Sequence, residues 1–127
     1  MLTYHLVPRD EYDPEAAEFV PAAFAQEGFI HTTKTLAMIH EVANRYYRAD
    51  PRPYLLLTID LDRATAPWRY DAAGEDYPHL YGPLNRAAVI GTRALPRAAD
   101  GEFLPVENAV ARPPQPPNAG GSTSGGR

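Results

Sequence analysis

One strongly apolar segment, residues 54–61 (YLLLTIDL), constrains the fold more than any other part of the chain. It follows the helix-breaking stretch DPRP at residues 50–53, and its leucine, isoleucine, threonine and tyrosine side chains favour a strand. The segment is apolar enough to be the central strand of a sheet. A chain of 127 residues can bury one such core without disulfide or metal staples.

Four further segments have the pattern of strands around this central one. Residues 2–7 (LTYHLV) alternate, so His5 is expected on one face with Thr3 and Val7, and Tyr4 and Leu6 on the other. The other three predicted strands are residues 28–31, 67–71 and 87–95. Together the segments predict a small α+β fold with a mixed, mostly antiparallel sheet and two helices.

The two helices are expected at positions with capping signals. A short acidic helix is predicted after Asp13, with Pro14 at its first position. A longer helix is predicted from Thr32 or Thr33, acting as N-cap, to about Arg48. Residues 77–85 (YPHLYGPLN) hold too much proline and glycine for a regular element, and we expect an ordered loop there.

Length and composition indicate a single domain and exclude several kinds of chemistry. Residues 1–107 are expected to form a single globular domain, and residues 108–127 a disordered tail rich in Pro, Gly and Ser. The absence of cysteine excludes disulfides, thiolate catalysis and cysteine-bound metals. The net charge of −4 gives no support to broad RNA or DNA binding, although it leaves room for one local basic cleft. Without a signal peptide or membrane span in the sequence, we expect a cytoplasmic protein.

Three histidines stand out as candidate catalytic residues. His5 lies in the middle of the first predicted strand, His31 ends a short strand, and His79 lies in the proline- and glycine-rich loop. Each by itself also has a purely structural interpretation, as a packed or hydrogen-bonded side chain. Several imidazoles on one sheet face would be costly to desolvate, and a ligand with hydroxyls and phosphates would explain them.

Polar residues near these histidines are candidate ligand-binding groups. Thr32, Thr33 and Lys34 would stand at the start of the predicted second helix, where unpaired amides attract phosphate. The other candidates are Arg69, Tyr81 and Asn85. Arg69 would share a strand face with Asp71, either as a surface ion pair or aimed at a phosphate or carboxylate. The histidines lack the spacing of a zinc motif, so no metal is expected.

In order along the chain, several short motifs resemble the bacterial family catalogued as domain of unknown function 952. They are TYHLVPR, EGFIHTT, VANRYY, WRYD, YPHLYGPLN and LPRAADGEF, which together span about residues 3–105. The resemblance implies a fold related to the ADP-ribosyltransferase superfamily, which includes RNA 2′-phosphotransferases. It also implies that His5 matches a first-strand histidine that holds a ribose hydroxyl, with His31 and Thr32 on a neighbouring strand end and His79 and Tyr81 closing the cleft.

The resemblance does not extend to the catalytic glutamate of that superfamily. Asp71, Glu75 and Asp76 lie nearest the corresponding region, but none stands in a transferase motif. The sequence therefore leaves two main hypotheses, both with a small nucleotide-like ligand. One is a transferase-type enzyme acting on NAD, ADP-ribose or an RNA-derived phosphate. The other is a non-catalytic nucleotide-binding or sensing module of the same fold, and a plain structural partner protein is a third.

Overall fold

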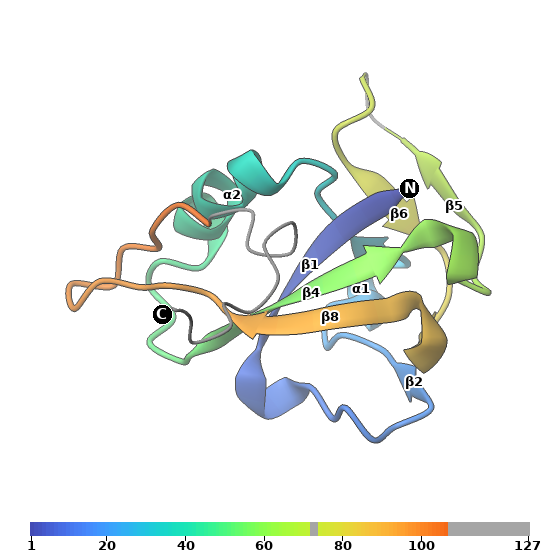
Figure 1. The fold of residues 1–127 in the computed structure, drawn as a ribbon, viewed down its shortest axis with the longest axis horizontal. Coiled ribbons are helices and arrows are strands. Elements are labelled where there is room, and N and C mark those ends of the chain that lie inside the picture. The colour runs from blue at the N-terminus through green and yellow to red at the C-terminus, as the bar shows by residue number, and fades with distance from the viewer. Residues whose placement is uncertain (72–73, 107–127) are drawn as a thin grey trace, which may run out of the picture.

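A three-stranded antiparallel sheet forms the centre of the computed structural model, which describes residues 1–71 and 74–106. Its strands are β1 (Leu2–Pro8), β4 (Tyr54–Asp60) and β8 (Val89–Ala94), in the order β1-β4-β8. Figure 1 shows them crossing the middle of the molecule, with α2 toward one end and β5 and β6 toward the other. The expectation that residues 54–61 supply the central strand is confirmed.

The central sheet is covered on both faces. Tyr4 and Leu6 of β1 pack with α2 in one core cluster. Thr3, His5 and Val7 share the other face of β1. All three side chains are buried, and Val7 belongs to a second core cluster. The alternation predicted from LTYHLV is therefore present, with both of its sides facing protein.

Two smaller sheets lie against this second face. One contains β3 (Ile30–His31), β6 (Pro78–Leu80) and β5 (Trp68–Tyr70), in the order β3-β6-β5, and the other pairs β2 (Glu18–Phe19) with β7 (Leu84–Asn85). A backbone bridge between Tyr4 and Thr33 joins β1 to the chain after β3. The expectation of an ordered loop at residues 77–85 was wrong, because the backbone of this segment pairs with β3, β5 and β2.

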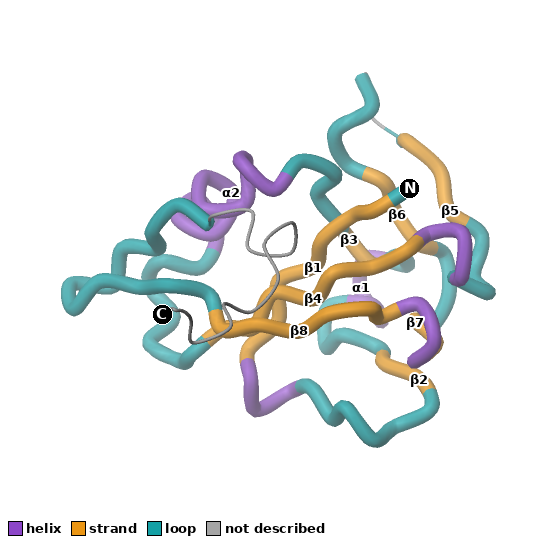
Figure 2. Tube along the Cα trace, viewed as in Figure 1, coloured by secondary structure: helices purple, strands orange, loops and turns teal. Residues whose placement is uncertain are grey.

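Helices are shorter than the sequence predicted (Figure 2). They are α1 (Phe24–Glu27), which ends at Gly28 with φ of 80°, and α2 (Ile39–Tyr46), preceded by a 3-10 turn at Leu36–Met38. Further 3-10 turns occupy Arg9–Glu11, Leu61–Arg63 and Arg86–Ala88. No described helix, in either range, is both long and apolar enough to cross a membrane.

Both expected helix starts were wrong. The Asp13 carboxylate accepts a hydrogen bond from the Glu15 amide at 2.9 Å, and this turn does not continue into a helix. Thr32 and Thr33 are buried and extended, because their backbones pair with Pro78 and Tyr4. The predicted anion site at a helix start directly after His31 is consequently absent from the fold. The predicted tail, residues 108–127, lies outside the described residues.

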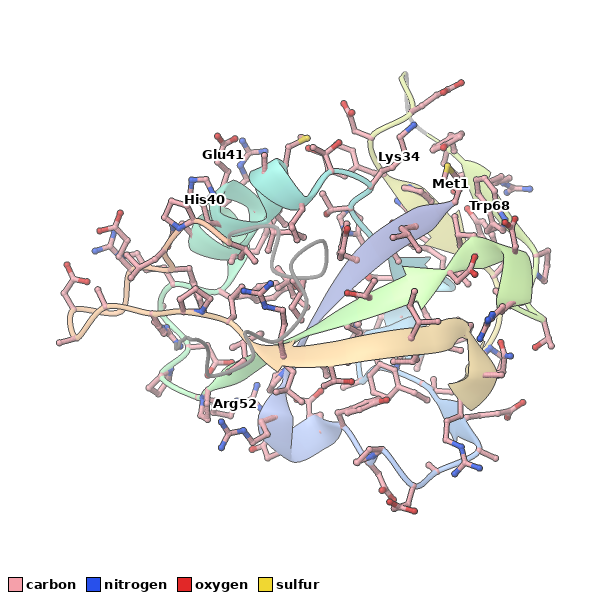
Figure 3. All side chains as sticks on the ribbon, in the orientation of Figure 1. Met1, Lys34, His40, Glu41, Arg52 and Trp68 are labelled. Atoms are coloured by element: carbon pink, nitrogen blue, oxygen red, sulfur yellow. The ribbon has the colours of Figure 1, made fainter. Side chains whose placement is uncertain are left out.

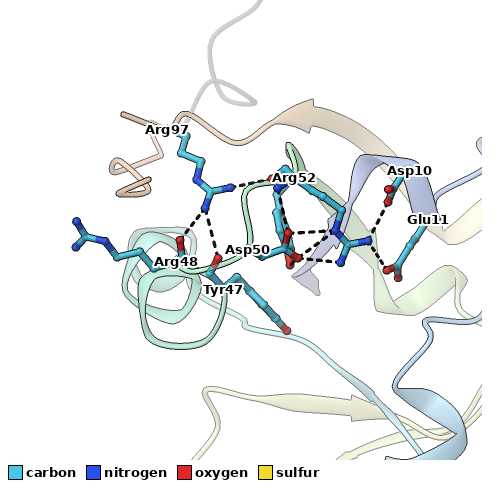
Figure 4. Close-up of polar contacts among 8 residues, drawn as sticks. Asp10, Glu11, Tyr47, Arg48, Asp50, Arg52 and Arg97 are labelled. Atoms are coloured by element: carbon cyan, nitrogen blue, oxygen red, sulfur yellow. Dashed lines mark hydrogen bonds and ion pairs between the residues drawn. The ribbon is translucent and has the colours of Figure 1, made fainter. Parts of the chain in front are cut away.

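Arg97, which follows β8, links the segment after α2 to the segment before β4 through hydrogen bonds (Figure 4). Its guanidinium donates to the backbone carbonyls of Arg48 at 2.9 Å, Arg52 at 2.8 Å and Gly101 at 3.0 Å. It also lies 4.1 Å from the centre of the Phe103 ring. The Arg48 carbonyl lies just beyond the end of α2, where the partial negative charge of the helix C-terminus favours a cation.

Replacing this arginine should weaken the fold. Arg97→Ala removes charged donors from several part-buried carbonyls, so we expect the free energy of unfolding to fall by about 2–3 kcal/mol in urea denaturation. Arg97→Lys should recover only part of the loss, because an ammonium lacks the planar fork. The exposed Arg45 on α2 is the matched control, and Arg45→Ala should change the same quantity by less than about 0.5 kcal/mol. Equal losses for the two alanine variants would contradict this role.

Candidate functional site

A pocket of about 200 Å³ lies between β1 and the segment that carries α1 and β3. Its wall includes four aromatic side chains, which are Phe24, Phe29, Tyr47 and Tyr54. Its polar lining consists of His5, His31, Glu11, Glu27 and Arg52. A concave, mainly aromatic surface with a few converging polar groups is typical of a small-molecule site.

His5 enters this pocket from the middle of β1 in one defined tautomer. Its ring contacts the backbone carbonyl of His31 through Nδ1 at 2.8 Å. A carbonyl only accepts, so Nδ1 carries the proton and Nε2 keeps its lone pair. Burial lowers the pKa of His5 to about 4, against the raising effect of this hydrogen bond. The imidazole is therefore neutral near pH 7 and acts as a hydrogen-bond acceptor.

His31 lines the same pocket from the end of β3 and is partly exposed. Its ring stacks on Tyr77, with 5.4 Å between centroids. Burial lowers the pKa of His31, and the neighbouring His79 lowers it further. A neutral imidazole that reaches a pocket can accept a proton from a bound molecule.

His79 lies next to His31 but outside the pocket wall. The two are directly paired across β3 and β6, and their rings are 5.3 Å apart. His79 Nδ1 donates to Asp71 at 2.9 Å, and the other oxygen of Asp71 accepts from Arg69 at 2.7 Å. Phe29 stacks on the His79 ring at 4.0 Å, so Phe29 and His31, rather than His79, face the pocket.

Arg69 and Tyr81 form a separate group on the outer sheet. The Arg69 guanidinium lies 4.5 Å from the centre of the Tyr81 ring, and its side chain is 69% exposed. In Figure 3, Lys34 and Trp68, the neighbour of Arg69, lie toward the upper right and Arg52, which lines the pocket, toward the lower left. The structure therefore does not bring Arg69 or Lys34 to the pocket.

The remaining predicted ligand-binding residues are engaged in internal contacts. The Thr32 hydroxyl donates to the Pro78 carbonyl at 2.6 Å and accepts from the Thr3 hydroxyl at 2.7 Å. Thr33 is 2% exposed. The Asn85 side chain accepts from the Thr65 amide and donates to the Arg63 carbonyl, both at 3.0 Å. It thereby closes the turn before β5, and none of the three lines the pocket.

Two carboxylates in the pocket were missed by sequence reasoning. Glu11 lies in the turn after β1 and pairs with Arg52 at 2.9 Å. Glu27 ends α1, and its carboxylate has no hydrogen bond or ion pair to any residue in 1–71 or 74–106. Glu27 directly precedes the GFIH motif, and this adjacency was the available signal. Within those ranges, no three acidic or histidine side chains gather in a way that could hold a metal ion.

The buried His5 should make stability depend on pH. Its pKa is lower in the folded chain than in the unfolded one, so its contribution is complete above about pH 6.5 and is lost as pH falls toward 4. The loss amounts to roughly 3 kcal/mol. We expect urea denaturation at pH 7 and pH 4 to show a larger fall for the wild type than for His5→Asn, which keeps a donor for the His31 carbonyl. Equal falls in both proteins would contradict the buried neutral imidazole.

Comparisons with known proteins place the chain in a family. A crystal structure of protein CC0527 from Caulobacter crescentus is 27% identical, covers 82% of this chain and 94% of its own, and has a TM-score of 0.66. A double mutant of that protein gives the same values. Its solution NMR structure is 29% identical over 79% of this chain and 89% of its own, with a TM-score of 0.59. No curated protein matches the chain significantly. The model of the family described as "Protein of unknown function (DUF952)" matches residues 7–92, more than half of the sequence, and the chain belongs to that family.

Proposed function

We propose that the protein is a transferase-like enzyme acting on NAD, ADP-ribose or a related phosphate-bearing nucleotide. One observation carries the proposal: His5 and His31 share an aromatic pocket with the carboxylate of Glu27, which no described residue pairs with. A hydrogen-bond acceptor, a proton acceptor and an anion around one small cavity are the groups that cleavage of a ribosyl bond requires.

The size of the pocket suits one end of such a substrate rather than the whole molecule. About 200 Å³ is below the usual range for a whole drug-sized ligand. We therefore assign to the pocket the nicotinamide ring and its ribose, with Phe24 or Phe29 available for stacking. The phosphates then lie beyond the mouth of the pocket.

Three polar residues, His5, Glu27 and His31, have distinct roles in this proposal. The lone pair on His5 Nε2 accepts a hydrogen bond from a ribose hydroxyl. Glu27 stabilises the positive charge that develops at the ribose carbon as its bond to the nicotinamide nitrogen breaks, with the bonding electrons leaving on nicotinamide. The acceptor group forms a new bond to that carbon, and His31 takes the proton that the acceptor loses.

A non-catalytic binding module of the same fold is the second candidate. The observation that favours it is the exposure of Glu27, because a carboxylate in water is a weaker electrostatic catalyst than a buried one. This candidate keeps the same pocket and ligand class but involves no bond cleavage.

Nicotinamide release from NAD separates these two functions. We expect the wild type to release nicotinamide, measured by liquid chromatography, and Glu27→Gln to lower kcat by about 100-fold or more. His31→Ala should also lower kcat, while the exposed Glu41→Gln on α2 serves as the matched control with unchanged turnover.

Calorimetric titration with NAD, ADP-ribose and AMP completes this test. Binding without release would support the sensing module instead of the enzyme. Absence of heat with all three ligands at millimolar concentration, together with absence of release, would remove the nucleotide proposal altogether.

A further inference from the structure

We propose that the pocket beside β1 selects an organic cation, namely a flat, positively charged ring that carries a hydrogen-bond donor. The pyridinium ring of oxidised nicotinamide, with its amide group, belongs to this class. The inference rests on the proposed function in that it concerns the same pocket. It adds the charge of the bound group and its hydrogen-bond donor. From the sequence alone, a ligand with phosphates was expected near these histidines.

The charged lining of the pocket is acidic overall. Glu11 and Glu27 contribute two carboxylates and Arg52 one cation. The Arg52 guanidinium is already shared among three carboxylates, at 2.8 Å from Asp50, 2.9 Å from Glu11 and 3.1 Å from Asp10 (Figure 4). Its charge is therefore more than neutralised locally, and it offers little to an anionic ligand.

The acidic field acts at the pocket wall itself. Tyr47 lines the pocket, and burial raises the pKa of its phenol. Glu27 and Glu11 each raise that pKa further, which means that both carboxylates are close enough to disfavour negative charge at this ring. Neither histidine adds a positive charge that would offset this field, because burial lowers the pKa values of both His5 and His31.

Aromatic side chains supply a second attraction for a cation. Phe24, Phe29, Tyr47 and Tyr54 lie around the same cavity. The face of an aromatic ring attracts a cation, and aromatic rings around a cavity are typical of sites that bind quaternary ammonium ligands. A neutral ring would stack here without the charge term, and an anion would be repelled.

The His5 side chain independently points to a ligand with a donor. His5 is 8% exposed and lines the pocket, and its Nδ1 is occupied by the His31 carbonyl. Its Nε2 has no partner among residues 1–71 and 74–106. Because this acceptor is open to the pocket rather than sealed in the core, a bound N–H or O–H group can reach it and form a hydrogen bond.

Small probes of one shape and different charge test this inference directly. The probes are 1-methylnicotinamide, a cation with an amide; nicotinamide, its neutral counterpart; and nicotinate, an anion. By calorimetric or NMR titration we expect the cation to bind about 3- to 30-fold more tightly than nicotinamide, and nicotinate to bind most weakly. The cation 1-methylpyridinium, which lacks the amide, should bind more weakly than 1-methylnicotinamide. Added salt should weaken binding of the cations and leave nicotinamide unchanged.

A variant tests the carboxylate itself. Glu27→Gln should reduce the preference for 1-methylnicotinamide over nicotinamide several-fold, while Glu41→Gln, an exposed carboxylate on α2, should leave the preference unchanged. Equal or tighter binding of nicotinate, an unaltered preference in Glu27→Gln, or no binding of any probe would overturn the inference.

The outcome is separable from that of the proposed function. Selective cation binding without nicotinamide release from NAD would overturn only the enzyme. Release from NAD with equal binding of the charged and neutral probes would overturn only the cation preference.

Discussion

Burial of β1 and β4 on both faces is the constraint on which the rest of the structure depends. Because side chains alternate along a strand, covering both faces forces every second residue of β1 into the second core as well as the first. Leu56 and Leu57 of β4 show the result, since these neighbours point to opposite faces and both have 0% exposure. The same alternation places His5 in the second core beside Val7, where an imidazole is costly unless it is hydrogen-bonded.

The His31 carbonyl accepts a hydrogen bond from His5, which offsets this desolvation cost and connects the central sheet to the site. Its hydrogen bond with His5 Nδ1 links β1 to β3 and leaves Nε2 as an acceptor. The buried hydroxyls of Thr3 and Thr32 form a parallel link at 2.7 Å. The hydrogen bond that the buried His5 needs for stability therefore also holds its ring in one orientation at the pocket. A binding site requires this kind of preorganisation.

Arginine serves structure more than recognition around the pocket. Arg97 and Arg52 both hold the chain between α2 and β4, through carbonyls in the first case and carboxylates in the second. They thereby fix the segment that supplies Tyr47 and Tyr54 to the pocket wall. Because these guanidinium groups are saturated, the electrostatic character of the pocket comes from its glutamates, and this separates it from a phosphate-binding site.

The sequence by itself determined the strand at residues 54–61, the alternation around His5 and the α+β class, because these depend on local periodicity. It also singled out His5 and His31 as candidate residues, although only the pairing of distant strands brings them to one pocket. Thr32 has the same local signal whether it caps a helix or pairs in a sheet, and only its contacts with Thr3 and Pro78 decided between them. Glu11, Glu27 and Arg52 are far apart in the chain, so only the tertiary structure could bring their charges to the same cavity.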